Sequence, residues 1–228
     1  MELQALATDY DGTLATLGCV DERTWRALRE LKSSGRMLIL VTGRRLGDLI
    51  EVFPGYGIFD RIVAENGALL YDPLSRKERL LAAAPPPEFV RALEARGVTP
   101  LEVGRSIVAT LVRNERIVMD TMIELGIGMV PILNKESLML LPPGVNKATG
   151  LRAALAELAI DASGVVGVGD AENDLDLILN CGIGAAVANA VPELKRAAQI
   201  HLTEESGSGV VELIETMLFE ATTAKPSA

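Results

Sequence analysis

The sequence predicts an α/β protein with a doubly wound parallel sheet and an inserted α+β domain. Short apolar runs alternate with helical patterns before residue 75 and again after residue 144. This alternation is typical of a parallel sheet whose two faces are covered by helices. The stretch between them breaks the alternation and ends in two strand patterns joined by a short turn. The 228 residues are enough for one domain with a smaller insert.

The predicted core comprises residues 1–75 and 144–220. Apolar runs that end in turn-forming residues predict its strands, and leucines spaced three or four residues apart predict its helices. Its first part contains a strand at 3–9, a helix at 21–34, a strand at 37–42, a helix carrying Leu46, Leu49, Ile50 and Phe53, and strands at 61–64 and 68–71 around a turn at 65–67. Its second part contains a helix at 146–159, a strand at 165–169, a helix at 173–180, a strand at 185–188 and a helix at 209–218.

The predicted insert, residues 76–143, lies between a charged stretch and a Pro-Pro-Gly stretch. Its pattern predicts antiparallel pairing, because the last two strands are joined by only three residues. The expected elements are a helix at 87–97, a strand at 101–112, a helix at 114–126 and strands at 128–133 and 137–141. After the core, residues 221–228 are expected to form a flexible tail.

Composition limits the classes of function. Hydrophobic residues make up 49% and charged residues 23%, which excludes a disordered chain. The net charge of -9 argues against nucleic acid or an anionic membrane as the main partner. Two distant cysteines and a single histidine, His201, argue against a disulfide scaffold and an all-protein zinc site. With no signal peptide visible, we expect a cytoplasmic monomer or homodimer.

Asp9 and Asp11 follow the first predicted strand in the segment Asp-Tyr-Asp-Gly-Thr. A spacing of two places both carboxylates on the same side of an extended backbone, and Gly12 allows a sharp turn beside them. Two close carboxylates need a cation or a shared proton. An ordinary solvated Asp-Gly turn is the other reading of this motif alone.

Three further polar segments are expected at the same edge of the sheet. Ligands of open α/β sheets bind outside the carboxyl ends of the strands, and chance alone rarely places so many polar groups there. Singly, these residues have ordinary explanations, such as a helix cap or an acidic first turn. The segments are Thr42-Gly43-Arg44-Arg45 after the second strand, Lys147 near a helix start, and Asp170 with Asn173 and Asp174 after the strand at 165–169.

Together, the segments at 9–14, 42–44, 147 and 169–174 resemble the four motifs of the haloacid dehalogenase (HAD) superfamily of phosphotransferases. The position of the insert, between the second and third motifs, is similar to that of the type IIB cap. Cof-like sugar-phosphate phosphatases, sucrose-phosphate phosphatases, archaeal phosphoglycolate phosphatases and phosphomannomutases carry such a cap. The resemblance covers residues 1–218, whereas no motif in the insert indicates a particular substrate.

The resemblance implies a Mg²⁺-dependent phosphatase acting on a small phosphate ester, a phosphoglycolate or a sugar phosphate. Asp9 would be the nucleophile that forms an aspartyl-phosphate, and Asp11 the acid and base. Thr42 would bind a phosphoryl oxygen, and Lys147 would balance charge. The implied metal ligands are Asp9, Asp11 through its carbonyl, Asp170, and Asn173 and Asp174, directly or one layer further out; the implied substrate-binding residues are Gly43, Arg44 and Asn66.

Several alternatives stay open at this point. A phosphomutase would use the same aspartyl-phosphate, and a receiver-like phospho-acceptor would carry a similar set of residues without turnover. The side chains of Arg44 and Arg45 either grip a second anionic group or pair with surface carboxylates. In the insert, the candidates for substrate contact, or for simple solvated loops, are Arg113, Asn134 and Lys135.

Overall fold

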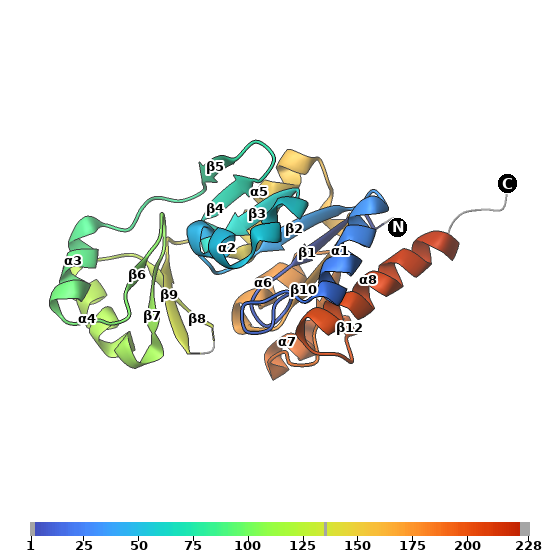
Figure 1. Ribbon diagram of the computed structural model, residues 1–228. Helices are drawn as coiled ribbons and strands as arrows, with labels where there is room; N and C mark the ends of the chain where they lie inside the picture. Colours follow the sequence, from blue (N-terminus) through green and yellow to red (C-terminus); the bar gives the residue numbers. More distant parts are fainter. Residues whose placement is uncertain (1–2, 135, 224–228) are drawn as a thin grey trace.

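A computed structural model describes residues 3–134 and 136–223, which form two sheets side by side (Figure 1). The larger sheet has eight strands in the order β12-β11-β10-β1-β2-β3-β4-β5. The smaller sheet has four strands in the order β6-β7-β9-β8. The described chain is thus an α/β protein with a second, antiparallel unit, as the sequence predicts.

The large sheet is parallel from β12 to β3. The chain runs from β1 outward through β2 and β3, and later from β10 outward through β11 and β12, so the winding reverses between β1 and β10. This reversal is the position where open α/β sheets bind ligands. The parallel strands are β1 (Ala5–Thr8), β2 (Met37–Val41), β3 (Arg61–Ala64), β10 (Val165–Gly169), β11 (Ile183–Ala186) and β12 (Ile200–His201).

Helices cover both faces of the large sheet. Alternate residues of β1 point to opposite faces: Leu6 belongs to one buried cluster, and Ala5 and Ala7 to another. The first cluster includes side chains of α1 (Glu22–Ser33), α2 (Leu46–Val52), α7 (Pro192–Ala197) and α8 (Ser206–Thr223), and the second includes side chains of α5 (Lys147–Leu158) and α6 (Leu175–Leu179).

The small sheet carries its helices on the side away from the large sheet (Figure 1). Phe89 and Leu93 of one helix and Met122 of the other are buried against Val108 and Leu140 of the strands. The opposite face, with Met139, packs against the large-sheet unit. The elements are α3 (Pro87–Ala95), β6 (Glu102–Val103), β7 (Val108–Leu111), α4 (Glu115–Leu125), β8 (Val130–Asn134) and β9 (Ser137–Leu141).

The single strand expected at 101–112 is wrong. Two antiparallel strands, β6 and β7, occupy this stretch, and a turn at 104–107 separates them. The turn is held from outside, because the side chain of Glu65 accepts hydrogen bonds from the backbone N–H groups of Arg105 and Ser106. A long-range contact of this kind leaves no trace in the local apolar pattern.

Two boundaries also differ from those expected: the start of the insert and the end of the core. β5 (Lys77–Leu80) lies within the range expected for the insert, yet it pairs antiparallel with β4 (Leu69–Asp72) of the large sheet. β5 is an exposed edge strand with mostly charged side chains, so it has no apolar pattern from which a strand could be predicted. α8 begins at Ser206 and extends to Thr223, into the expected tail, whereas residues 224–228 lie outside the described part of the chain.

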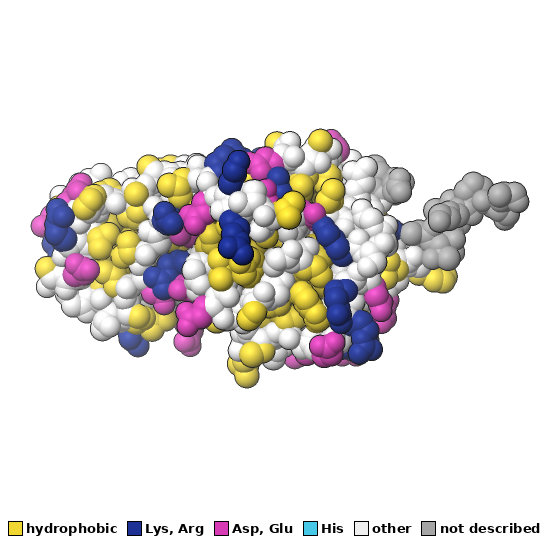
Figure 2. All heavy atoms as spheres, turned by 45° about the horizontal axis from the view of Figure 1, so that its top comes forward, with side chains coloured by type: hydrophobic (Ala, Val, Ile, Leu, Met, Phe, Trp, Pro, Cys, Tyr) yellow, Lys and Arg dark blue, Asp and Glu magenta, His cyan; other side chains and the backbone are white. Residues whose placement is uncertain are grey.

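Acidic and basic side chains alternate over the face shown in Figure 2 and do not gather by sign. This face is therefore a mixed, solvated surface without a patch of one sign. No helix among the described residues has both the length and the hydropathy needed to cross a bilayer.

Candidate active site

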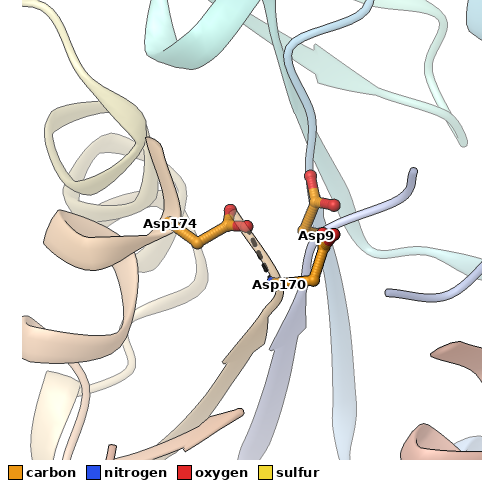
Figure 3. A group of neighbouring side chains, drawn as sticks. All are labelled: Asp9, Asp170 and Asp174. Atoms are coloured by element: carbon orange, nitrogen blue, oxygen red, sulfur yellow. Dashed lines mark hydrogen bonds between the residues drawn. The ribbon is translucent and has the colours of Figure 1, made fainter. Parts of the chain in front are cut away.

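Three acidic side chains meet at the carboxyl edge of the large sheet (Figure 3). Asp9 follows β1 and Asp170 follows β10, and these two strands pair in parallel. Asp174 ends the 3-10 helix Glu172–Asp174, one turn after Asp170. One carboxylate oxygen from each of the three lies within 4.8 Å of the others. The strand ends thus bring together residues that are 161 positions apart in sequence (170 − 9).

Lys147 is the cation of this cluster. Its Nζ donates hydrogen bonds to Asp9 Oδ1 at 2.6 Å and to Asp174 Oδ1 at 2.5 Å. It is the first residue of α5, and only 1% of its surface is exposed. Buried charges are found paired or bound to metals because their desolvation is costly. Three carboxylates around one ammonium leave an uncompensated negative charge in the cluster.

The pKa shifts in the cluster follow from this imbalance. Burial raises the pKa of Asp9 well above its ordinary value, the carboxylates of Asp174 and Asp170 raise it further, and Lys147 opposes them. Burial acts to lower the pKa of Lys147, but the carboxylates of Asp174 and Asp9 outweigh it and the pKa is raised. Lys147 is therefore charged, and the cluster has room for further positive charge.

Hydrogen bonds fix the two aspartates that follow β10. Asp174 Oδ2 accepts the backbone N–H groups of Asp170 and Ala171, both at 3.0 Å. Thr13 donates to Asp170 Oδ1 at 3.0 Å. Thr13 belongs to the Asp-Gly-Thr segment, but the sequence analysis assigns it no role; its position directly after the turn at Gly12 is the signal that could have indicated one.

Gly12 allows the turn after Asp11 to approach the cluster closely. Its φ of +82° lies in the left-handed region, and a Cβ at this position would sit 2.4 Å from Asp170 Oδ2. The sharp turn expected from the sequence is present, and it places Thr13 against Asp170.

Asp11 does not join the buried cluster of the described residues. Its carboxylate accepts two hydrogen bonds from Arg44, one from Nε at 2.6 Å and one from Nη2 at 2.7 Å. The hydrogen bond to Asp11 raises the pKa of the Arg44 guanidinium. Arg45 pairs in the same way with Asp48. Both arginines thus bind carboxylates of this chain, which was one of the two readings open from the sequence.

The segment after β2 contacts the turn between β3 and β4. Thr42 is buried, and its hydroxyl accepts the backbone N–H of Arg44 at 3.1 Å. The backbone carbonyl of Thr42 accepts the N–H of Asn66 at 3.0 Å. Gly43 lies beside Asn66, because a Cβ at Gly43 would be 3.4 Å from Asn66 Oδ1.

The side chain of Asn66 bridges the two units. Its Nδ2 donates to the sulfur of Met139 in β9 at 2.9 Å, and its Oδ1 accepts from Asn173 at 2.9 Å. The Oδ1 of Asn173 is buried and has no hydrogen-bond partner among the described residues. Asn66 and Asn173 therefore lie together at the seam between the cluster and the small sheet.

A pocket of about 400 Å³ opens beside Lys147. The small sheet contributes one wall through β8, and the large-sheet unit contributes the polar wall. The lining residues are Asn66, Pro131, Ile132, Leu133, Asn146, Lys147, Glu172, Asn173 and Asp176. Of the insert residues considered from the sequence, Arg113 instead donates to the Thr99 carbonyl, and Lys135 lies outside the described residues.

Gly67 sets the position of α5, and its replacement by alanine is expected to destabilise the protein. Its φ is +107°, and a Cβ would lie 1.9 Å from the carbonyl oxygen of Asn146, the residue that caps the helix start next to Lys147. We expect Gly67→Ala to lower the unfolding free energy by about 2–4 kcal/mol, measured by urea denaturation. Gly57→Ala is the matched control, because a Cβ there meets nothing within 4 Å; equal stabilities of the two variants would contradict this account.

The fold and the buried carboxylate–lysine cluster define a class of α/β enzymes that act at the switch point of a doubly wound sheet, under a second domain. The chain belongs to the haloacid dehalogenase-like hydrolases, whose family model matches residues 6–93 and 127–214. The resemblance, the fold class and the expected class of enzyme, a phosphatase of this superfamily, are confirmed.

Relatives extend the likeness over nearly the whole chain. A phosphoglycolate phosphatase of Methanothermobacter thermautotrophicus is 28% identical, over 95% of this chain and 99% of the relative. One of Metallosphaera sedula is 30% identical, with the same two coverages of 95% and 99%. Among solved structures, a HAD subclass IIB sugar phosphatase matches with a TM-score of 0.77 at 16% identity, over 93% of this chain and 98% of that chain. The matches include the small-sheet unit as well as the core.

Proposed function

We propose that this phosphatase hydrolyses a small phosphate ester, with phosphoglycolate as the first candidate, through phosphorylation of Asp9 and with the help of Mg²⁺. The observation that carries the proposal is the buried cluster in which Lys147 bridges Asp9 and Asp174 beside Asp170. The names of the relatives from two archaea support the candidate substrate. A hydrolase family also favours turnover over a receiver-like phospho-acceptor.

The cluster fits a magnesium ion. Mg²⁺ prefers carboxylate and other oxygen ligands and retains several waters, and Asp9, Asp170 and Asp174 each offer a buried oxygen within 4.8 Å of the others. Three carboxylates with one ammonium carry an excess of two negative charges, which a divalent cation would neutralise. The buried Oδ1 of Asn173 offers a further acceptor for a metal-bound water. When bound, the ion would neutralise charge on the phosphoryl group.

The protein's own residues supply the covalent chemistry in two steps. A carboxylate oxygen of Asp9 forms a bond to phosphorus while the ester oxygen leaves and takes a proton from Asp11. A water then attacks the phosphorus of the acyl phosphate, gives its proton back to Asp11, and releases phosphate with the Asp9 carboxylate restored. Arg44 positions Asp11 through its two hydrogen bonds, so Asp11 must exchange this partner to reach the leaving oxygen.

The other site residues would orient the phosphoryl group. The Thr42 hydroxyl accepts one hydrogen bond and, among the described residues, donates none, which leaves its proton for a phosphoryl oxygen. Lys147 would stabilise the negative charge that is shared between Asp9 and the phosphoryl group. Gly43 and Asn66 lie where the rest of the substrate would enter from the pocket.

The small-sheet unit, residues 82–141, would act as a cap over the site. β8 already provides the apolar wall of the pocket, with Pro131, Ile132 and Leu133. A cap that closes over substrate excludes bulk water from the acyl phosphate and strengthens the electrostatic interactions of the cluster.

The proposal is tested with a panel of phosphate esters, with released phosphate measured at fixed Mg²⁺. We expect phosphoglycolate or a sugar monophosphate to be turned over faster than p-nitrophenyl phosphate, because only a metabolite is expected to contact the cap. A hexose 1-phosphate converted to its 6-phosphate without release of phosphate would instead establish a phosphomutase. The absence of turnover of every ester would contradict the proposal.

Magnesium should also stabilise the folded protein. A ligand at 100 times its Kd raises the unfolding free energy by about 2.7 kcal/mol, so thermal unfolding of EDTA-treated protein should shift upward as Mg²⁺ is titrated. Asp170→Asn should remove most of this shift, because the carboxylate belongs to the cluster. Asp11→Asn should retain it, since the Asp11 carboxylate binds Arg44. A Mg²⁺ response that is the same in wild type and Asp170→Asn would contradict the assignment.

A further inference from the structure

Glu65 connects the turn beside the site to the small sheet. One oxygen of its carboxylate accepts the backbone N–H of Arg105 and the other accepts that of Ser106, both at 2.8 Å. The residue is 1% exposed, although glutamate is almost never fully buried unless it is partnered. Hydrogen bonds to an ionised acceptor are roughly twice as strong as neutral ones. This pair of bonds is therefore a strong contact between the large-sheet unit and the small-sheet unit.

The surroundings of the carboxylate are shaped to receive it. A Cβ at Gly104 would lie 2.7 Å from the carboxylate carbon and from both of its oxygens, so a side chain at this position would collide with Glu65. The hydroxyl of Ser106 also donates to the carbonyl of Ala82 at 3.0 Å, which gives the turn at 104–107 a second anchor. Glu65 itself has a φ of +53°, a conformation that glutamate rarely adopts. Glu65 therefore keeps an unfavourable backbone conformation in which its side chain reaches the 105–106 backbone.

The same turn contacts the candidate active site. Asn66, the next residue, bonds to Met139 of the small sheet on one side and to Asn173 on the other. Pro131, Ile132 and Leu133 of β8, which pairs with β9, form the cap-side wall of the pocket. Any movement of the small sheet relative to Glu65 therefore changes the pocket.

We propose that Glu65 is a positioning residue that holds the small sheet closed over the pocket. The role in turnover rests on the proposed function, because it assumes that substrate occupies this pocket. Opening the sheet breaks both charge-assisted bonds to the 105–106 backbone, so the contact favours the closed arrangement. Glu65 touches neither the acidic cluster nor Lys147 in the hydrogen bonds and ion pairs of the described residues.

The test combines amide exchange with steady-state kinetics of Glu65→Gln. The glutamine side chain has one acceptor oxygen, so one of the two backbone N–H groups would face an NH₂ group and lose its bond. Loss of a charge-assisted bond corresponds to about a tenfold or larger change in an equilibrium. We expect exchange at Arg105 and Ser106 to accelerate about tenfold or more, and KM for the preferred ester to rise by a similar factor. Since saturating substrate restores closure, kcat should stay within about threefold.

Two further variants make the result independent of folding defects at position 65. Gly104→Ala keeps the carboxylate but displaces it, and should change exchange and KM in the same direction. Arg105→Ala is the matched control, because its backbone N–H remains. Among the residues that the structure describes, its exposed side chain forms an ion pair only with Glu78, at 3.0 Å, so both readouts should stay within about twofold. If Glu65→Gln does not fold, amide exchange and KM of Gly104→Ala test the proposal in its place.

The outcomes separate this role from others. Equal exchange at residues 105 and 106 in wild type, Glu65→Gln and Gly104→Ala would overturn the proposal, as would a loss of kcat with unchanged KM. If the wild type turned over no phosphate ester, the proposed function would fail, whereas amide exchange would still decide whether Glu65 holds the sheet.

Discussion

Asp9→Asn is expected to lower kcat by roughly 10⁴-fold or more, because an amide cannot form the acyl phosphate on which turnover depends. The Asp9 carboxylate is the group that Lys147 holds at 2.6 Å from its ammonium nitrogen. Substrate binding should persist, since the other groups of the site remain. The measurement is phosphate release at saturating substrate, together with isothermal titration of the substrate onto the variant.

The folding stability of Asp9→Asn distinguishes loss of chemistry from loss of structure. Burial and the neighbouring carboxylates raise the pKa of Asp9, so its charge costs stability at neutral pH in the absence of metal. The neutral asparagine removes this cost, and the variant without metal should be at least as stable as the wild type to urea. An inactive variant that is also much less stable, or one that keeps wild-type kcat, would contradict the assigned role.

Lys147→Met is expected to have the second largest effect, on both stability and turnover. Removal of one partner from a buried ion pair costs about 3–5 kcal/mol, and here two carboxylates, of Asp9 and Asp174, lose the same cation. We expect kcat to fall by roughly 10³-fold, because the charge shared with the phosphoryl group is no longer stabilised. Lys32→Met is the matched control: it removes a partly exposed pair with Asp60 and should cost about 1 kcal/mol or less.

The loss of stability in Lys147→Met should depend on pH in a defined direction. The pKa of Lys147 is raised on folding, so its contribution is fully present below the unfolded pKa of lysine, which includes the whole neutral range, and is lost only as pH rises through the folded pKa. In the variant, the carboxylates are left without the cation, and their protonation relieves the repulsion. Urea unfolding should therefore show a stability deficit that is large at pH 7.5 and smaller at pH 5. A deficit that does not change with pH would contradict this explanation.

Much of the fold could be predicted because the central strands of the large sheet have a clear local sequence pattern. The buried runs at β1, β2 and β10 are continuous apolar segments followed by polar residues, and parallel strands expose those polar residues at one edge. The grouping of Asp9, Asp170, Asp174 and Lys147 follows from that edge and from a helix start near it. The residues at the strand ends were enough to predict that Asp9 and Asp170 share one edge, whereas the role of Lys147 was implied only by the resemblance to the HAD superfamily.

The features that sequence reasoning missed depend on contacts between distant segments. The break between β6 and β7 is held by Glu65, about 40 residues away in sequence, and β12 has only two residues, too few for a periodic pattern. The pairing of Arg44 with Asp11 was left open, because a guanidinium beside an anion site binds either the substrate or a carboxylate of the chain. Such choices are decided by side-chain geometry, which local patterns do not contain.

The central claim is that the side chain of Asp9 becomes phosphorylated during turnover. The most direct measurement is rapid acid quenching of the Asp11→Asn variant during turnover, followed by borohydride reduction, which converts an aspartyl-phosphate into homoserine, and peptide mapping by mass spectrometry. The account predicts homoserine at position 9 and at no other aspartate. Homoserine at another aspartate, or an unmodified position 9 in protein that is releasing phosphate, would contradict it.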